Sequence, residues 1–373
     1  MKYYIIAGER SGDLHASNLM KELKKRDEQA EFRCWGGDEM EKAGGTLVRH
    51  YRETAFMGVL EVVANLNKIR GFLKECKQDI LDYQPDVVVL VDYAGFNMKI
   101  AGFAKEHGFK TFYYISPKVW AWNQDRAKKI KKVVDRMFVI MHFEQDFYKK
   151  YDYEVDYVGN PLFDAISQFE PNEHFLEENG LSEDKPIIAI LPGSRKQEVT
   201  SILHTMLSIV PKYRDQYEFV VAGVDNLPDE LYAEARAMNM KIVVGKTYDL
   251  LSYAQSAVVT SGTATLETAL FEVPQVVCYK TSWVTFYLAK LAIKVDFISL
   301  VNLIAGKEVV KELIQGEFTA ENLEAELLKT LGGERDRILK DYAEMKALIK
   351  TEGTSKRTAA LMTQYLTEKK SSI

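Results

Sequence analysis

The two halves of the chain open with the same local pattern: a short apolar run, a turn that contains glycine, and a segment of helical periodicity. In the first half, YYIIA at residues 3–7 is followed by the turn 8–13 and a helical segment over 14–25. In the second half, IIAIL at residues 187–191 is followed by the turn 192–195 and a further helical segment. Strands that alternate with helices in this way pair in parallel. The sequence therefore predicts an α/β fold with doubly wound parallel sheets.

The length of 373 residues predicts more than one domain, because single cores stop growing near ~250–300 residues. The strand pattern is interrupted by Gly-Asn-Pro and an acidic stretch over 159–184, and strand signals end by about residue 318. We expect a Rossmann-like N-terminal domain over residues 1–165 and a Rossmann-like C-terminal domain over 166–345, facing each other across a cleft. Helices over 346–373 are expected to pack back on the N-terminal domain.

Composition and charge argue against several classes of function. A net charge of −5 provides no overall basic field for nucleic acid. Cys34, Cys76 and Cys278 have no disulfide or zinc spacing, and the histidines and carboxylates form no metal motif. No uncharged apolar run approaches the ~18–20 residues of a membrane span, and the chain begins with a strand pattern instead of a signal peptide. We expect a cytoplasmic protein with no metal, no cofactor and no nucleic-acid partner.

The turn in the second half, Gly193-Ser194-Arg195, fits an anion site. A small-residue turn between a strand and a helix presents backbone N–H groups and the positive end of the helix. Arg195 adds a planar cation suited to phosphate. The turn matches neither the Walker nor the GxGxxG fingerprint, so an ordinary strand–helix corner with a surface arginine remains the alternative.

A second candidate anion site is SGTAT, which follows the apolar run at 257–260 and begins a helix. Unpaired N–H groups and hydroxyls at such a helix start can hold a diphosphate. The candidate ligands are Ser261, Gly262, Thr263 and Thr265. Glu267, in the first helical turn, suits a sugar diol. Simple helix capping by Ser, Thr and Glu is the alternative.

In the first half, Asp92 follows the continuous apolar run VVVLV. An acid at the carboxyl end of a parallel strand lies where ligands bind, and it can act as a general base if it reaches a hydroxyl. Capping of the next helix is the alternative. His15 is a rival base, although a lone histidine one turn into a helix is more often satisfied by its neighbours.

Two stretches carry surplus apolar surface, residues 56–73 and 283–304. The first places Val59, Val62 and Val63 on one helical face with other apolar residues, and the second combines aromatic side chains with Lys290 and Lys294. Apolar and basic residues together fit an acyl-chain site or a membrane interface. Core packing or a dimer contact is the commoner cause of such a pattern, and the surface is compatible with a homodimer.

An ordered set of motifs over about residues 7–315 resembles the lipid-A-disaccharide synthase family, inverting glycosyltransferases of GT-B architecture. The segments that carry the resemblance are AGERSGDLHA, MGVLEVV, PDVVVLVD, YYISPKVWAW, LPGSRKQEV, TSGTATLETAL and SLVNLIAGKEVVKELIQ. The resemblance implies that UDP-2,3-diacylglucosamine donates its sugar to 2,3-diacylglucosamine 1-phosphate. The products would be a β-1,6-linked disaccharide 1-phosphate and UDP, made without a metal and at the inner membrane by a peripherally attached enzyme.

The resemblance also assigns site residues. Asp92 and Arg195 fall where the family has its essential aspartate and arginine, and Asn302 matches an asparagine of the UDP site. We expect the N-terminal domain to supply the acceptor cleft and the base, and the C-terminal domain to bind the UDP-sugar. The residues expected in the sugar and acceptor cleft are Gly8, Glu9, Ser11 and Gly12. Gly95 stands where the family often has a second acid, which strengthens Asp92 as the base.

Two rival functions remain open from the sequence. A UDP-sugar 2-epimerase shares the two-domain shape and the nucleotide end but has no use for acyl-accommodating surface. A non-catalytic nucleotide-sugar-binding protein would bind UDP and form no disaccharide. The two apolar stretches and the SPKVWAW segment favour the transferase.

Overall fold

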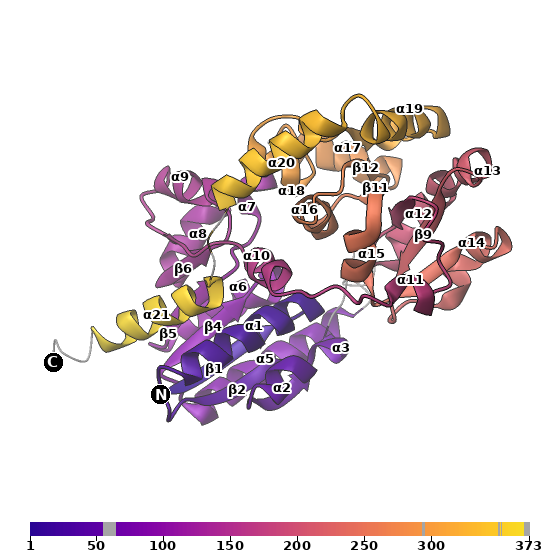
Figure 1. Ribbon diagram of the computed structural model, residues 1–373. Helices are drawn as coiled ribbons and strands as arrows, with labels where there is room; N and C mark the ends of the chain where they lie inside the picture. Colours follow the sequence, from indigo (N-terminus) through magenta and orange to yellow (C-terminus); the bar gives the residue numbers. More distant parts are fainter. Residues whose placement is uncertain (55–64, 293–294, 350, 352, 369–373) are drawn as a thin grey trace. The chain divides into compact units, whose positions relative to one another are not determined.

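The structure is a computed structural model that describes residues 1–54, 65–292, 295–349, 351 and 353–368. It divides into two compact units, Met1–Pro161 with Thr351–Ile373, and Leu162–Lys350 (Figure 1). The first division falls in α10 (Pro161–Ser167). The sequence predicted breaks at 165/166 and 345/346.

The first unit is built on a seven-stranded parallel sheet in the order β3-β2-β1-β4-β5-β6-β7. Its strands are β1 (Lys2–Ala7), β2 (Glu31–Gly36), β3 (Thr46–His50), β4 (Val87–Val91), β5 (Lys110–Tyr114), β6 (Arg136–Val139) and β7 (Asp156–Tyr157). The sequence does not predict β3, because this edge strand reads TLVRH and none of its residues is fully buried.

Helices connect these strands and cover both faces of the sheet (Figure 1). They are α1 (Arg10–Lys24), α2 (Asp38–Lys42), α3 (Tyr51–Thr54), α5 (Leu66–Tyr83), α6 (Ala94–Glu106), α7 (Val119–Trp122), α8 (Arg126–Val133), α9 (Phe143–Lys149) and α21 (Thr354–Thr367). Successive side chains of a strand point to opposite faces of the sheet, so Tyr3 and Tyr4 of β1 lie on different faces. Tyr3 joins the core formed with α1 and α21, where Leu19 and Met362 lie. Tyr4 donates to Asp79 of α5 at 2.6 Å on the other face.

The second unit has a six-stranded parallel sheet in the order β10-β9-β8-β11-β12-β13. Its strands are β8 (Ile187–Leu191), β9 (Glu218–Gly223), β10 (Lys241–Val244), β11 (Ala254–Thr260), β12 (Gln275–Tyr279) and β13 (Glu312–Ile314). Every residue of β4 and of β8 is buried. Continuous apolar runs of this kind are typical of parallel strands covered on both faces.

Both faces of the second sheet are covered as well. Alternate residues of β8 pack with α12 and α19 on one face and with α11 and α15 on the other. The helices of this unit are α11 (Phe175–Glu178), α12 (Lys196–Leu207), α13 (Val210–Tyr213), η1 (Asp229–Tyr232), α14 (Ala233–Ala237), α15 (Thr247–Tyr253), α16 (Thr263–Leu270), α17 (Trp283–Ala292), α18 (Leu300–Ala305), η2 (Gln315–Glu317), α19 (Ala320–Leu331) and α20 (Arg335–Ile349).

The strand order reverses once in each sheet, between β1 and β4 and between β8 and β11. The last register pairs at these two places are Ala7 with Val91 and Leu191 with Val259. Open α/β sheets bind ligands beyond the carboxyl ends of the strands at such switch points. The first switch point therefore carries the turns that follow β1 and β4, and the second carries those that follow β8 and β11.

Within the described residues, no helix combines the length and the apolar character needed to cross a membrane.

Candidate active site

The turn after β8 holds an anion that belongs to the chain itself. Gly193 has φ 108°, and a Cβ placed there would lie 2.5 Å from Oε2 of Glu198. The N–H groups of Ser194 and Arg195 donate to that oxygen at 3.1 and 3.3 Å. Nη1 of Arg195 lies 3.0 Å from Oε1 of the same carboxylate. The turn therefore binds a carboxylate with the groups that the sequence predicted for a phosphate.

The Arg195 side chain is 53% exposed, although its guanidinium is paired with Glu198. Tyr279, at the end of β12, lies near this pair. Burial raises the pKa of Tyr279, the charge of Glu198 raises this pKa further, and the charge of Arg195 lowers it. A cation, a carboxylate and a phenol thus gather at the carboxyl edge of the second sheet.

The turn after β11 uses most of its hydroxyls internally. Ser261 donates to the carbonyl of Ile298 at 3.0 Å. The Thr265 hydroxyl is buried, donates to the Gly262 carbonyl at 2.8 Å and accepts from the Leu300 N–H at 3.3 Å. Gly262 and Thr263 are exposed at the start of α16. The exposed part of this helix start is therefore smaller than the predicted set of Ser261, Gly262, Thr263 and Thr265.

Asn302 is a fully buried member of a polar network. Its Oδ1 accepts from the N–H groups of Val309 and Val310 at 2.8 and 3.0 Å, and its Nδ2 donates to the Val310 carbonyl and to Glu312, each at 2.9 Å. Glu312 also accepts from the N–H and hydroxyl of Ser299. An asparagine amide has two donors and two acceptor sites, so the protein uses all four. The predicted contact of Asn302 with UDP would require part of this network to open.

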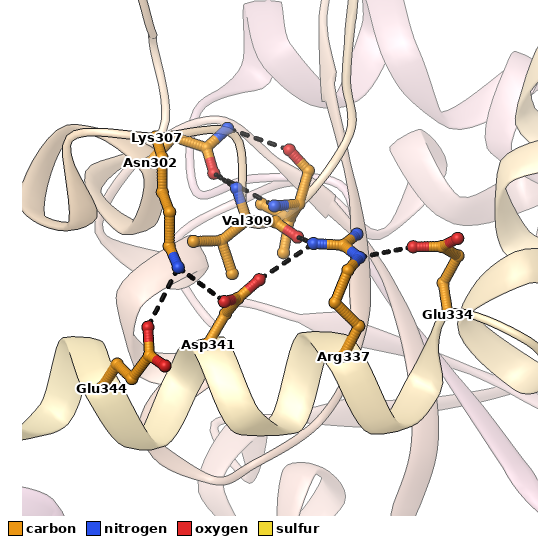
Figure 2. A network of polar contacts seen from close by, with 8 residues as sticks. Asn302, Lys307, Val309, Glu334, Arg337, Asp341 and Glu344 are labelled. Carbon is orange, nitrogen blue, oxygen red and sulfur yellow. Dashed lines mark hydrogen bonds and ion pairs between the residues drawn. The ribbon is translucent and has the colours of Figure 1, made fainter.

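Figure 2 shows how this network continues onto α20. Arg337 donates to the Val309 carbonyl at 3.3 Å and to Asp341 at 2.9 Å. Lys307 pairs with the same Asp341 at 2.7 Å and with Glu344 at 3.0 Å. The segment SLVNLIAGKEVVKELIQ, which the sequence singled out, is thereby tied through Lys307 to a helix more than thirty residues further along. Side chains of this segment hold the loop of residues 298–300. In that loop the Ile298 carbonyl accepts from the Ser261 hydroxyl, and the Leu300 N–H donates to the Thr265 hydroxyl.

Glu267 of α16 accepts a hydrogen bond from Tyr248 of α15 at 2.9 Å. Burial raises the pKa of this carboxyl group, and the Tyr248 hydrogen bond partly offsets the shift. Phe169 and Phe271 pack against the Tyr248 ring, with centroids 5.4 and 5.2 Å from it. The predicted contact of Glu267 with a ribose diol stays a prediction.

At the first switch point, Asp92 and Tyr93 have φ values of 47° and 48°. Two consecutive residues other than glycine in the left-handed region store strain that the surrounding contacts must hold. The Asp92 N–H donates to the Tyr114 carbonyl at 3.1 Å, and its own carbonyl accepts from Nδ2 of Asn97 at 2.8 Å and from the Tyr113 hydroxyl. The backbone of Asp92 is therefore fixed at the end of β4. Its side chain is partly buried.

Gly8 is required by close packing at the same edge. A Cβ at Gly8 would lie 2.2 Å from the Tyr93 ring. Tyr93 also donates to the Thr54 carbonyl at 2.8 Å and stacks on Phe96 with a centroid distance of 5.4 Å. The turns after β1 and β4 therefore contact each other directly. Of the other predicted cleft residues, Glu9 is the N-cap of α1 and partly buried, Ser11 is exposed and Gly12 is buried.

Asp13 and His15 both lie within the first two turns of α1. Asp13 is buried and accepts from the N–H groups of Gly37, Glu39 and Met40, at 2.8 to 3.1 Å. Its carboxylate therefore caps α2. Burial lowers the pKa of His15 to about 4. His15 is thus neutral at physiological pH, and its role as a rival base remains untested.

The sequence pattern of the lipid-A-disaccharide synthetase family matches residues 3–365. Two curated relatives, both named lipid-A-disaccharide synthase, come from Syntrophus aciditrophicus and Geobacter metallireducens. They are 38% and 37% identical, over 96% and 98% of this chain and 96% and 97% of their own lengths. The chain belongs to the lipid-A-disaccharide synthetase family. The family predicted from the sequence is confirmed, and with it an enzyme of lipid A biosynthesis.

The chain also resembles solved structures of low sequence identity. One is the UDP-GlcNAc 2-epimerase of Neisseria meningitidis bound to UDP-GlcNAc, with a TM-score of 0.68, 12% identity, and coverage of 98% of this chain and 100% of that one. Another is the glycotransferase of kitacinnamycin, with a TM-score of 0.66, 13% identity, and coverage of 98% and 99%. Such likeness shows the fold alone. The predicted GT-B architecture of two parallel-sheet α/β units is confirmed.

Reasoning from the sequence did not identify several carboxylates that organise the turns of this chain. Glu198 had a local signal, because it stands three residues after the N-cap Arg195, as in a capping box. Asp13 and Glu312 had none, since they bind Gly37 and Ser299, 24 and 13 residues away, and the bond from Ser116 to Glu144 spans 28 residues. Among the residues that the structure describes, no group of three or more His, Cys, Asp or Glu side chains is arranged so that it could bind a metal ion.

Proposed function

We propose that this protein transfers the sugar of UDP-2,3-diacylglucosamine to 2,3-diacylglucosamine 1-phosphate. The products are the β-1,6-linked disaccharide 1-phosphate and UDP. Family membership supports the reaction. The observation that carries the assignment of the site is the strained Asp92–Tyr93 backbone at the first switch point, since such strain clusters at active sites.

The second unit is the donor unit in this proposal. Its switch point brings the turn of residues 193–195 beside the start of α16, so a diphosphate there meets Arg195, the Ser194 hydroxyl and the exposed Thr263. The ribose lies near Glu267, whose carboxylate the Tyr248 hydroxyl orients. Asn302 acts on UDP through the loop that it holds.

The first unit is the acceptor unit, with Asp92 as the general base. Asp92 takes the proton of the acceptor 6-hydroxyl as its oxygen attacks C1 of the donor sugar. The bond between C1 and the diphosphate oxygen breaks, and its electron pair leaves with UDP. Attack from the face opposite the leaving group converts an α-linked donor into a β product, so the reaction inverts the anomeric centre.

Charge that develops on the diphosphate is met by the chain itself. The Arg195 guanidinium and the N–H groups of the turn are the donors, as in oxyanion-type stabilisation. The positive ends of α12 and α16 add to them. No metal ion takes part in this proposal. Because Glu198 occupies the same donors, the diphosphate must compete with its carboxylate.

The test is turnover of the two purified acylated substrates by wild-type protein and by Asp92→Asn, with Asp82→Asn as the exposed control. Loss of a general base typically costs about 10²–10⁴ in rate. We expect that loss for Asp92→Asn with UDP binding retained, and normal turnover for the control. Turnover by Asp92→Asn within a few-fold of wild type would show that Asp92 is not the base.

The second candidate, a UDP-sugar 2-epimerase, is favoured only by the fold shared with the Neisseria enzyme. Incubation of the protein with UDP-GlcNAc alone separates the two activities. A C2 epimer in that reaction, with no disaccharide from the acylated pair, would favour the epimerase. UDP binding without either product would favour a non-catalytic binding protein.

We further infer peripheral attachment to the cytoplasmic face of the inner membrane. The stretch 118–132 holds six basic residues and one acidic residue in a chain of net charge −5. The five basic residues of α8 are exposed. Trp122 is 44% exposed, and the Arg126 guanidinium lies 4.5 Å from its ring. Basic residues with an interfacial aromatic are typical of attachment to anionic lipid.

A second exposed surface lies on α17 in the other unit. Trp283 and Tyr287 are 56% and 59% exposed and stack with centroids 5.9 Å apart, and Lys290 is exposed as well. Of the other predicted apolar and basic residues, Val59, Val62, Val63 and Lys294 lie outside the described residues. The aromatic pair is suited to an acyl chain or a bilayer, and it is also compatible with a homodimer.

Sedimentation with vesicles tests the attachment. We expect binding to vesicles that contain phosphatidylglycerol, weakened by salt and by Lys129→Glu with Lys132→Glu. Lys21→Glu with Lys340→Glu is the control of equal charge on other exposed helices. Failure to sediment with anionic vesicles at any ionic strength would contradict the attachment. Sedimentation equilibrium without lipid reports whether the chain forms a dimer.

A further inference from the structure

Glu144 joins two turns at the carboxyl edge of the first sheet. It lies in the first turn of α9, after β6, and is only 2% exposed. Its Oε2 accepts from the N–H groups of Ile140 and Met141, at 3.2 and 3.0 Å. Its Oε1 accepts from the indole N–H of Trp120 at 3.2 Å and from the Ser116 hydroxyl. One oxygen thus binds the turn after β6, and the other binds the segment after β5.

The segment held by Glu144 lies next to Asp92. Strands β4, β5 and β6 are neighbours in the sheet, and the Asp92 N–H donates to the carbonyl of Tyr114, the last residue of β5. Ile115 follows with φ 63°. A β-branched residue is strained in this region and stays there only when its surroundings hold it. Ser116, the next residue, is the one that Glu144 binds.

The same segment ends in two exposed side chains. Lys118 precedes α7, and Trp122 is the last residue of that helix. Trp120, between them, is buried and packs edge-on against Phe143, with centroids 4.9 Å apart. The buried indole therefore anchors the segment to α9 and leaves a cation and an aromatic ring at the surface. These two groups are suited to a phosphate and to the face of a sugar.

We propose that Glu144 is a positioning residue for the acceptor, because its carboxylate fixes residues 115–122 beside Asp92 in the geometry that holds a phosphorylated sugar. This inference rests on the proposed function. The inference goes beyond the proposed function in two ways. It assigns acceptor recognition to the segment ISPKVWAW, and it assigns control of that segment to a carboxylate 22 or more residues away. Asp92 remains the base, and Glu144 acts on the reaction only through the segment.

The donors around Glu144 favour a carboxylate over an amide. All four partners of Glu144 act as donors, and a glutamine in its place would present one acceptor oxygen and one NH₂ group. Whichever way the amide turned, its NH₂ would face at least one N–H donor, either the backbone N–H groups of Ile140 and Met141 or the indole N–H of Trp120. Burial raises the pKa of Glu144 to about 7, and the four hydrogen bonds favour the ionised form. Desolvation and these hydrogen bonds thus act in opposite directions on the pKa of the carboxyl group, an arrangement that is typical of functional sites.

The test compares Glu144→Gln and Trp120→Phe with Glu106→Gln, an exposed control at the end of α6, in assays with both substrates. Titration with UDP counts folded chains, since UDP binds the other unit in the proposed function. A misplacement of about 1 Å can cost ~100-fold. We expect Glu144→Gln to lower kcat/KM for the acceptor about 10- to 100-fold, mostly through KM, with donor KM and UDP affinity unchanged. Trp120→Phe, which removes one of the four donors, should lower it about 3- to 10-fold.

Two results would overturn the inference. One is an acceptor kcat/KM within threefold of wild type in Glu144→Gln that binds one UDP per chain. The other is an equal rise in donor KM and acceptor KM, which indicates general loosening of the fold. If Glu144→Gln does not fold, Trp120→Phe and Ser116→Ala decide, and an unchanged acceptor KM in both rejects the role. Wild-type protein that forms no disaccharide contradicts the proposed function instead.

Discussion

Glu198 binds Arg195 twice, through the guanidinium at 3.0 Å and through the backbone N–H at 3.3 Å. The same carboxylate accepts the N–H of Ser194. In the proposed function a diphosphate at this turn needs these donors, so Glu198 and the nucleotide would compete for one set of groups. The turn that the sequence indicated as an anion site presents two N–H groups and a guanidinium, and all three bind a carboxylate of the chain itself.

Replacing Glu198 by glutamine should tighten UDP binding about 2- to 5-fold at low ionic strength, because an exposed ion pair of this kind is worth at most ~1 kcal/mol. The amide oxygen can still accept from the turn, while the charge that opposes the diphosphate is gone. Calorimetric titration with UDP measures the effect, which should shrink with added salt. Glu173→Gln, on an exposed loop of the same unit, is the control. Tenfold weaker binding would instead mean that Glu198 holds the turn in its binding shape.

Gly8→Ala should destabilise the protein by about 1–3 kcal/mol, because the new methyl group overlaps the Tyr93 ring. Combining it with Tyr93→Ala should cost less than the sum of the two single changes. Urea denaturation followed by tryptophan fluorescence measures all three. Gly95→Ala is the matched control, since no atom lies within 4 Å of a Cβ there and alanine favours the helix by about 0.5–1 kcal/mol. Equal effects at Gly8 and Gly95 would refute the packing argument.

Asn302→Ala should lower stability by about 3–5 kcal/mol, because it leaves buried groups of Val309, Val310 and Glu312 without their partner. UDP affinity, measured well below the melting temperature, should change less than threefold if Asn302 acts as a scaffold. A loss of tenfold or more with little loss of stability would show direct contact with the nucleotide. The exposed Asn322→Ala provides the control.

The stability contributed by Glu144 should fall as pH rises. Its folded pKa, raised by burial to about 7, lies above the value of about 4.5 in the unfolded chain. The contribution is therefore fully present below pH 4.5 and is lost as pH rises through 7, by about 3 kcal/mol in total. The difference in unfolding free energy between wild type and Glu144→Gln, measured by urea denaturation from pH 4.5 to 8, reports it. A difference that does not vary with pH would contradict the shift.

Most of the candidate site could be predicted because its residues follow strands directly. Asp92 after VVVLV, Gly193 after IIAIL and Ser261 after the run at 257–260 all sit in local strand–turn–helix patterns. The roles of their side chains could not be predicted in the same way. Nothing local shows that the Thr265 hydroxyl is committed to Gly262 and Leu300, because Leu300 comes from another segment.

The sequence by itself determined the strand–turn–helix units, the family, and the turns that carry Asp92, Arg195 and small hydroxyl residues. These depend on short-range periodicity and on residue types within a few positions of each other. Only the tertiary structure decided which turns are neighbours, because strand order places Gly8 against Tyr93 and the turn at 193–195 beside Ser261. It also decided that Glu144 binds the segment after β5 and that Glu312 binds Ser299 and Asn302. A buried carboxylate takes whichever N–H donors the folded chain brings to it, and for Glu144 and Glu312 those donors include groups on other segments.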